Sequence, residues 1–318
     1  MPQAAELIRA ADTIAVAGHL NPDGDCIGSL LALGLGLRTL GKRVWMLSHD
    51  EFPPRFRRLP GAGEVRSTTD AEMDLAISVD VSMKQMLGDV RPVFEKSAQI
   101  VEIDHHEYRA PFGDVQVVDQ DAAAVGELVY LLLDDLGVGL TPEIAQNILT
   151  SIVVETLSFR VPQVRPFTFS LCAKLLETGV DFSSLAEMVY WSQGREATVL
   201  LGICLSRCSF LQKGKIAWSI VTKEDFERVQ GADEDIDPGA SEMLAIQGVE
   251  VSVLFREKKE GWLRVSMRSK GRVNVAEAAE KFDGGGHFDA AGCVIPNEQS
   301  KMDALLGKIR ELLIENGG

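Results

Sequence analysis

Short apolar runs alternate with amphipathic stretches through the first half of the 318-residue chain. Five of these runs have the length of strands and lie at residues 13–17, 43–47, 75–79, 99–103 and 115–118. Amphipathic stretches with helical spacing separate or follow them, among them residues 27–40, 123–136 and 142–154. Strands that alternate with helices predict an α/β domain, built on a mainly parallel, doubly wound sheet with helices on both faces.

A helical stretch over residues 184–206 contains the polar segment 192–196, and the pattern changes after it. Strand patterns then follow at 215–221, 249–256 and 262–266, with helical patterns at 275–282 and 301–315. They predict a smaller α+β domain, in which the acidic segment 230–239 is an exposed loop. A chain of this length exceeds the usual size of one domain. We therefore predict a large domain over residues 1–185, a helical linker over 186–208 and a smaller domain over 209–318, with a cleft between the domains.

Polar residues stand just past the ends of three of the predicted strands, namely His19, Asp80 and Asp104. In parallel sheets, ligands bind beyond the carboxyl ends of the strands. The first of these residues opens a segment in which Asp23 and Asp25 are separated by one glycine. Carboxylate and imidazole together suit Mn²⁺, Mg²⁺, Fe²⁺ or Zn²⁺. The alternative is that one of the two aspartates only caps the following helix.

The triplet Asp104-His105-His106 is unusual at the edge of a predicted sheet. Burying it without partners would be costly, so these side chains either bind a ligand or form an internal hydrogen-bond network. We favour ligation. His106 need not bind a metal, because an imidazolium there could hold a phosphate or protonate a leaving oxygen.

Two further carboxylates are candidates by position. Turn formation alone would explain Asp80, and Glu155 could simply be a carboxylate at the end of a helix. Taken with the other candidates, however, they complete a set of six, comprising His19, Asp23, Asp25, Asp80, His105 and Glu155. Six ligands suit two divalent cations, and by its order in the chain Asp80 is best placed to bridge them. Two such cations that activate a shared water form a common phosphoesterase arrangement.

These residues fall into motifs that resemble one family. The motifs are His19-x-x-Pro22-Asp23-x-Asp25-x-x-Gly28-Ser29, Asp80-Val81-Ser82, Asp104-His105-His106, the region 150–160, Arg268-Ser269, Gly284-Gly285-Gly286-His287 and Ala290-Ala291-Gly292. The chain resembles the DHH phosphoesterases, a superfamily that includes RecJ-like exonucleases. Within it, the chain is most similar to the nanoRNase/pAp-phosphatase branch with a DHH-associated C-terminal domain. The resemblance spans nearly the whole chain.

The resemblance implies a metal-dependent phosphoesterase that acts on short oligoribonucleotides (nanoRNA), on pAp-type nucleotides or on both. One manganese-type ion would be bound by His19, Asp23 and Asp80, and a second by Asp25, Asp80, His105 and Glu155. Mg²⁺, Fe²⁺ or Co²⁺ could replace manganese. His106 would contact the scissile phosphate, and we group Asp104 with it as catalytic. The residues expected to bind the substrate are Arg268, Ser269, Gly284, Gly285, Gly286 and His287.

The chain departs from the family pattern at three positions. The fourth motif usually has aspartate where this chain has Glu155, and glycine where it has Leu157. Asp283 replaces the first of four glycines in the glycine loop. These changes keep two alternatives open, a linear or cyclic dinucleotide phosphodiesterase and a nucleotide-binding regulator with weakened turnover.

Composition excludes several other classes. The net charge of −15 argues against a binder of long nucleic acid, which needs a basic track for the phosphates. No apolar run approaches the roughly 20 residues that span a bilayer, and no signal peptide is recognisable, so we expect no membrane partner. The five cysteines are an odd number and favour a reducing cytoplasm over a disulfide framework. The sequence does not fix the oligomeric state, and a homodimer is compatible with it.

Three other features could be read as functional. Cys26 lies inside the first motif and is a soft metal ligand by chemistry, but its small apolar neighbours favour packing at the start of a helix. His49 is expected on a loop surface, and so is the basic cluster 55–58.

Overall fold

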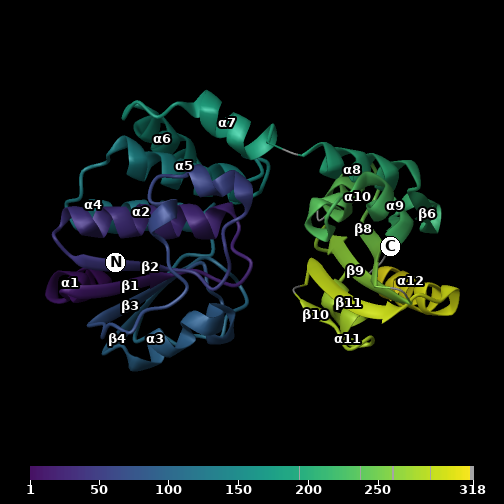
Figure 1. The fold of residues 1–318 in the computed structure, drawn as a ribbon, viewed down its shortest axis with the longest axis horizontal. Coiled ribbons are helices and arrows are strands. Elements are labelled where there is room, and N and C mark those ends of the chain that lie inside the picture. The colour runs from purple at the N-terminus through teal and green to yellow at the C-terminus, as the bar shows by residue number, and fades with distance from the viewer. Residues whose placement is uncertain (193, 237, 260, 287, 316–318) are drawn as a thin grey trace. The chain divides into compact units, whose positions relative to one another are not determined.

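The computed structural model describes residues 1–192, 194–236, 238–259, 261–286 and 288–315. The chain divides into two compact units, Met1–Ser192 and Gln193–Gly318 (Figure 1). The division falls inside the predicted linker 186–208. The helical stretch predicted over 184–206 consists of two helices, α7 (Phe182–Tyr190) and α8 (Arg195–Ser206). Among the described residues, no helix is long and apolar enough to cross a membrane.

The first unit is built around a parallel sheet of five strands in the order β2-β1-β3-β4-β5. Its strands are β1 (Thr13–Ala17), β2 (Arg43–Leu47), β3 (Leu75–Val79), β4 (Gln99–Asp104) and β5 (Val115–Val118). Its α-helices are α1 (Pro2–Ala10), α2 (Gly24–Thr39), α3 (Arg91–Lys96), α4 (Val125–Asp135), α5 (Pro142–Glu155), α6 (Pro166–Leu176) and α7. Three 3₁₀ helices, η1 (Pro54–Arg58), η2 (Ala62–Glu64) and η3 (Lys84–Val90), lie in its connections.

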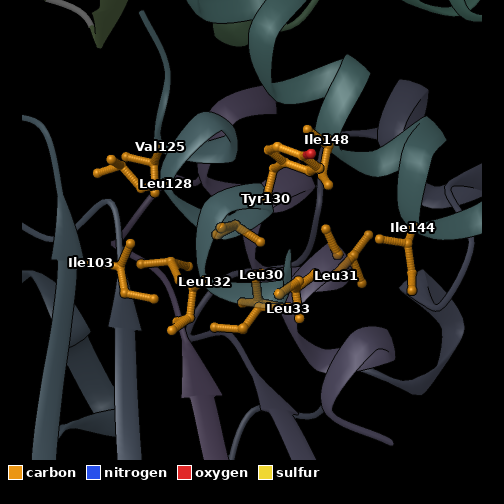
Figure 2. Close-up of a cluster of buried hydrophobic side chains, with 14 of the residues drawn as sticks. Leu30, Leu31, Leu33, Ile103, Val125, Leu128, Tyr130, Leu132, Ile144 and Ile148 are labelled. Atoms are coloured by element: carbon orange, nitrogen blue, oxygen red, sulfur yellow. The ribbon is translucent and has the colours of Figure 1, made fainter. Parts of the chain in front are cut away.

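Both faces of this sheet are covered, as the sequence predicts. Because successive side chains of a strand point to opposite faces, Ile14 and Val16 join one apolar core while Ala15 and Ala17 join another. The first core contains side chains of α2, α4 and α5, and Figure 2 shows Leu30 of α2 next to Leu132 of α4. The second core contains residues of η3 and α3. The sheet is therefore doubly wound.

The packing of α2 against α5 aligns the ends of these helices that carry the candidate ligands. Asp23 caps α2, since its Oδ1 accepts hydrogen bonds from the backbone N–H groups of Asp25 at 2.9 Å and Cys26 at 3.1 Å. A Cβ atom on Gly28 would lie 2.4 Å from the carbonyl oxygen of Asn147 in α5. Only glycine allows this close approach, which holds the start of α2 against α5.

The second unit contains a mixed sheet of six strands in the order β10-β11-β9-β8-β7-β6. Its strands are β6 (Ser209–Leu211), β7 (Ile216–Val221), β8 (Val251–Lys259), β9 (Trp262–Ser269), β10 (Gly285–Gly286) and β11 (Ala290–Pro296). Its helices are α8, η4 (Gln212–Gly214), α9 (Lys223–Val229), η5 (Asp233–Ile236), α10 (Gly239–Leu244), α11 (Val275–Glu280) and α12 (Gln299–Glu315). Side chains of α11 and α12 contribute to one apolar core, and those of α8 and α10 to another. The predicted α+β class of this unit is confirmed.

The prediction of an exposed loop over 230–239 is wrong for part of the segment. Asp233 and Ile236 lie in η5 and are buried. The carboxylate of Asp233 accepts a hydrogen bond from the guanidinium of Arg264 at 2.8 Å, and buried Arg256 lies within ion-pair distance of it. Acidic composition alone does not reveal these arginines, which are supplied by strands β8 and β9.

Candidate metal centre

The candidate residues gather at the carboxyl ends of β1, β3 and β4. In the sheet, β2 lies on one side of β1, whereas β3, β4 and β5 follow one another on its other side. The order thus reverses between β1 and β3, and ligands bind at such switch points in parallel sheets. His19 follows β1, Asp80 follows β3, and Asp104 is the last residue of β4.

Three overlapping groups of donor atoms form at this edge. They are His19 with Cys26 and Asp80, then Asp80 with His105 and His106, and finally Asp25 with His105 and Glu155. Within each group, one ligand atom from each residue lies within 4.8 Å of the others. Asp80 and His105 each belong to two groups, so the three groups form one continuous cluster.

The distances within the cluster support this connection. Nε2 of His19 lies 3.5 Å from Oδ2 of Asp80. Nε2 of His105 lies 3.8 Å from both Asp25 Oδ2 and Glu155 Oε1, and 3.9 Å from Asp80 Oδ1. The structure therefore brings together His19, Asp25, Asp80, His105 and Glu155, five of the six predicted ligands.

Asp23, the sixth predicted ligand, lies at the rim of the cluster. Its Oδ1 caps helix α2, so the simpler role considered from the sequence is present. Part of the residue is exposed, but crowding by the surrounding protein and the negative charge of Asp80 raise its pKa. Capping leaves the second carboxylate oxygen available, and the residue is close enough to Asp80 to interact with it electrostatically.

The two predicted histidine ligands are oriented in the same way. Nδ1 of His19 lies 2.7 Å from the carbonyl oxygen of Leu20, and Nδ1 of His105 lies 3.1 Å from that of Ala122. A carbonyl can only accept, so Nδ1 carries the proton in both rings. In the neutral form, Nε2 then presents a lone pair to the carboxylates. This backbone anchoring is typical of histidines that bind metals.

Asp80 occupies a strained position at the centre of the cluster. Its φ of 60° lies in the left-handed region, which is costly for a residue with a side chain. Its side chain is buried, and within the described part of the chain Oδ1 has no hydrogen-bond partner. A buried carboxylate oxygen without a partner is expensive, and a cation would satisfy it.

The neighbouring carboxylates are destabilised in their charged form. Burial and the negative charge of Asp80 raise the pKa of Asp25 to about 7. Burial and the charges of Asp25 and Asp80 raise the pKa of Glu155 to about 9. Burial would lower the pKa of His105, but the surrounding carboxylates outweigh it and raise this pKa to about 9. Such a site is short of positive charge, and its oxygen and imidazole donors fit divalent cations of the Mn²⁺ type.

A second acidic group beside the cluster is fully paired. Asp104 is buried, and its Oδ1 accepts a hydrogen bond from Nδ1 of His106 at 2.7 Å. Its Oδ2 accepts from Nε of Arg109 at 2.6 Å, and the same guanidinium pairs with buried Glu102. Burial would raise the pKa of Asp104, but the hydrogen bonds and the charge of His106 together outweigh it and lower this pKa. Asp104 therefore orients His106 through its ring nitrogen.

His106 belongs to the cluster and also contacts the paired group. Its Nδ1 is 3.5 Å from Asp80 Oδ1, and about a third of its side chain is exposed. Burial would lower the pKa of His106, but the hydrogen bond to Asp104 and the charge of Asp80 raise it. The ring is thus favoured as an imidazolium.

The loop after Glu155 has an unusual backbone. Leu157, Ser158 and Phe159 have φ values of 47°, 61° and 66°, all in the left-handed region. The side chain of Thr156 supports the turn by accepting a hydrogen bond from the N–H of Phe159 at 2.9 Å. The glycine that the family usually has at position 157 would adopt this conformation with less strain.

A polar cavity of about 330 Å³ adjoins the cluster. His105 and Glu155 contribute to its wall. Its other lining residues are Glu107, Gln120, Asp121, Ala122, Ala123, Val161 and Gln163. The cavity could hold part of a ligand bound at the cluster.

The predicted substrate residues of the second unit lie around the start of β11. Arg268 pairs in register with Ala290, and Gly286 pairs with Ala291. A Cβ on Gly284 would lie 2.3 Å from the carbonyl oxygen of Gly292, so this glycine allows two backbone segments to approach. Space around Gly285 is open. His287 lies outside the described residues.

Two other predicted residues have structural explanations. Ser269 is buried, and its hydroxyl donates to the carbonyl of Val273 at 2.7 Å. Asp283 has a φ of 55°, which explains why the family has glycine at this position.

The structure also places His49, the basic cluster 55–58 and Cys26, which the sequence favours as surface or packing residues. His49 lies on a loop, where its Nδ1 accepts a hydrogen bond from the N–H of Asp89 at 3.1 Å. Arg55, Arg57 and Arg58 in η1 are exposed. Cys26, interpreted from the sequence as helix packing, is fully buried at the start of α2, and its sulfur also lies beside donor atoms of His19 and Asp80. Its position inside the first motif was the one signal available in the sequence.

Comparisons with known proteins cover both units. A family model described as "DHH family, N-terminal domain" matches residues 13–153, and one described as "DHHA1 domain" matches residues 226–315. The chain is 33% identical over 317 residues to the bifunctional oligoribonuclease and PAP phosphatase NrnA of Thermus thermophilus. That alignment covers 98% of this chain and 94% of the relative.

Solved structures share the fold. An exopolyphosphatase-related protein from Bacteroides fragilis superposes with a TM-score of 0.92 at 23% identity, covering 100% of this chain and 97% of that one. Exonuclease RecJ bound to manganese superposes with a TM-score of 0.54 at 16% identity, covering 98% of this chain and 94% of that one. At these identities the likeness concerns the fold.

Proposed function

The chain belongs to the DHH family, and from this premise we propose that it is a divalent-metal-dependent phosphoesterase that hydrolyses short oligoribonucleotides and pAp-type nucleotides. The observation that carries the proposal is the continuous cluster in which Asp80 and His105 each belong to two groups of potential ligands. The similarity to a bifunctional oligoribonuclease and PAP phosphatase over 98% of this chain supports the substrate class.

In this proposal, His19, Asp23 and Asp80 bind one cation, and Asp25, Asp80, His105 and Glu155 bind a second. Mn²⁺ is the first candidate, because the donor atoms suit it and the structurally similar RecJ is described as manganese-bound. Bound there, the two cations would supply an activated water and would neutralise charge on the phosphoryl group. The cations would be bound by Nε2 of His19 and of His105 and by the carboxylate oxygens of the cluster.

His106 and Asp104 have different roles in the proposal. His106 has a raised pKa, so its imidazolium can bind a phosphate oxygen and can donate a proton to the leaving oxygen. Asp104 has both carboxylate oxygens engaged by His106 and Arg109. It is therefore a positioning residue, which fixes the tautomer and the direction of the His106 ring.

The second unit is proposed to bind the nucleotide. Arg268 would pair with a phosphate, and the backbone of Gly285 and Gly286 would approach the phosphate or the sugar closely. The proposal includes His287 from its motif. Ser269 would contribute indirectly, because its hydroxyl holds the turn at Val273. We propose a cytoplasmic location, because the odd number of cysteines argues against a disulfide framework.

The test is a panel of hydrolysis assays with and without Mn²⁺, on pAp, short RNA, linear and cyclic dinucleotides and pyrophosphate. We expect manganese-dependent hydrolysis of pAp and short RNA, lost in Glu155→Gln and retained in Glu143→Gln. Glu143 is a matched control, since it lies exposed in the first turn of the same helix. A manganese-loaded protein that hydrolyses neither pAp nor RNA would overturn the proposal. Turnover confined to cyclic dinucleotides would reassign the substrate, and binding without turnover would indicate a regulator.

A further inference from the structure

Cys26 is buried at the start of α2, where its sulfur lies among potential metal donors. Its thiol has no exposed surface. Among the described residues, the apolar cores contain its neighbour Ile27 but not Cys26 itself. Its Sγ instead lies with the ligand atoms of His19 and Asp80 in a group whose members are all within 4.8 Å of one another.

The backbone around the sulfur is arranged to accommodate it. The N–H of His19 donates a hydrogen bond to Sγ at 3.3 Å. A Cβ atom on Gly18 would lie only 2.1 Å from Sγ, so the absence of a side chain at position 18 gives the sulfur its space. This hydrogen bond favours the thiolate, but burial outweighs it and raises the pKa of the Cys26 thiol to about 11, so the thiolate forms only when a cation binds.

The spacing of the three donors suits a single cation. In zinc sites, nitrogen lies about 2.1 Å and sulfur about 2.3 Å from the ion. A nitrogen and a sulfur that bind the same ion are therefore at most about 4.4 Å from each other. Shifts of a few tenths of an ångström would bring donors that lie within 4.8 Å to this limit. Asp80 supplies the buried carboxylate that faces this group, with Oδ2 3.5 Å from Nε2 of His19.

We propose that Cys26 is a metal ligand beside His19 and Asp80, through which this position binds thiophilic divalent cations such as Zn²⁺, Co²⁺ and Cd²⁺ by sulfur. On binding, the Sγ–H bond breaks, the proton passes to the buffer and the Sγ–metal bond forms. Soft thiolate ligands select such ions over Mg²⁺ and Mn²⁺. This inference rests on the proposed metal centre and adds a donor that the six-ligand set lacks.

The test is a Cd²⁺ titration followed by the ultraviolet charge-transfer absorption of cadmium–thiolate bonds. Wild type is compared with Cys26→Ser and with Cys172→Ser, a matched control that removes a buried thiol from the same unit. We expect the absorption in wild type and Cys172→Ser and its loss in Cys26→Ser. The ratio of Cd²⁺ to Mn²⁺ affinity should fall at least about tenfold in Cys26→Ser, since even supporting groups of metal sites contribute that much.

Equal absorption in wild type and Cys26→Ser, or none in wild type, would overturn the inference. If Cys26→Ser does not fold, cadmium NMR of the wild-type protein still decides, because sulfur ligation shifts the resonance far from that of an all-oxygen and nitrogen site. Hydrolysis with Mn²⁺ is measured separately. Manganese-dependent turnover without cadmium–sulfur bonding would reject only this inference, and sulfur bonding without turnover would reject only the proposed activity.

Discussion

Two groups of carboxylates, buried except for the half-buried Glu155, lie side by side at the same edge of the parallel sheet, and they differ in their cationic partners. The paired group is Glu102 and Asp104, which share the guanidinium of Arg109. The ligand cluster contains Asp25, Asp80 and Glu155, and no Arg or Lys forms an ion pair with any of the three within the described residues. The pKa of Asp104 is lowered, whereas those of Asp25 and Glu155 are raised. Among the three carboxylates of the ligand cluster, Asp80 alone has a lowered pKa despite its burial, because His19 hydrogen-bonds to it.

The presence or absence of an Arg or Lys partner distinguishes carboxylates with a structural role from carboxylates that can bind a metal. Acids that the protein itself neutralises are held in place and can orient a neighbour, as Asp104 orients His106. Acids that the protein leaves short of positive charge are costly unless a cation completes them. The comparison therefore predicts that variants of the ligand cluster will affect metal-dependent properties, and that variants of the paired group will affect the fold.

The largest effect is expected at Asp80, which connects the groups of the ligand cluster. Asp80→Asn should lower the manganese-dependent hydrolysis rate more than about a hundredfold, beyond the loss typical of a supporting residue. Its unfolding free energy without metal should change little, because the substitution relieves repulsion of Asp25 and Glu155 but also loses the pairing of Asp80 with His19. Steady-state kinetics and urea unfolding check the two statements. Near-normal turnover in this variant would contradict the assignment.

The paired group should respond in the opposite way. Arg109→Met leaves Glu102 and Asp104 buried without their cation, and it should cost about 3–5 kcal/mol of unfolding free energy. Arg91→Met is the control, because Arg91 pairs with Glu95 on the surface and should cost less than about 1 kcal/mol. Urea unfolding of both variants gives the comparison. A mild effect of Arg109→Met would mean that the pair does not support this edge.

The pH dependence of stability should separate the metal-free and metal-bound protein. Carboxyl groups with raised pKa values bind more protons in the folded state, so the metal-free protein loses stability as pH rises from the ordinary carboxyl range of about 4 through about 7 for Asp25 and about 9 for Glu155. His105, with its pKa raised to about 9, adds a loss of the same sign above about 6.5. Thermal unfolding should therefore show that stabilisation by Mn²⁺ grows with pH, reaching about 2.7 kcal/mol when the free ion exceeds its Kd a hundredfold. Stabilisation that does not change with pH would contradict the raised pKa values.

The smallest effect is expected in the loop that carries the chain away from Glu155. Leu157 is 62% exposed and has a φ of 47°. Leu157→Gly should relieve this strain and raise the unfolding free energy by up to about 1 kcal/mol, after the greater flexibility of the unfolded chain is subtracted. Leu157→Ala is the control, since it keeps the strain. A destabilised glycine variant would show that the leucine side chain itself supports the loop.

Much of this arrangement follows from local sequence patterns. The positions of the five strands of the first sheet could be predicted because each is a short apolar run between turn residues. The match of the DHH model to residues 13–153 confirms the family that the motifs predicted. The ligands could be placed at one edge because residues that follow parallel strands share that edge.

What could not be predicted depends on contacts between distant residues. The burial of Asp233 depends on arginines from other strands, and the role of Asp104 depends on Arg109, whose position beside two acids appears only in the folded chain. The direction of the Cys26 sulfur depends on the path of the backbone at Gly18. The reach of Glu155 toward His105 likewise depends on how α5 packs against α2.

The number of manganese ions bound per chain tests the central claim most directly. Equilibrium dialysis of the purified protein against Mn²⁺, followed by metal analysis, should give two ions per chain for wild type. Asp80→Asn should bind fewer than two, because the carboxylate proposed to serve both ions is lost. No bound manganese in wild type, or two ions retained by Asp80→Asn, would contradict the account.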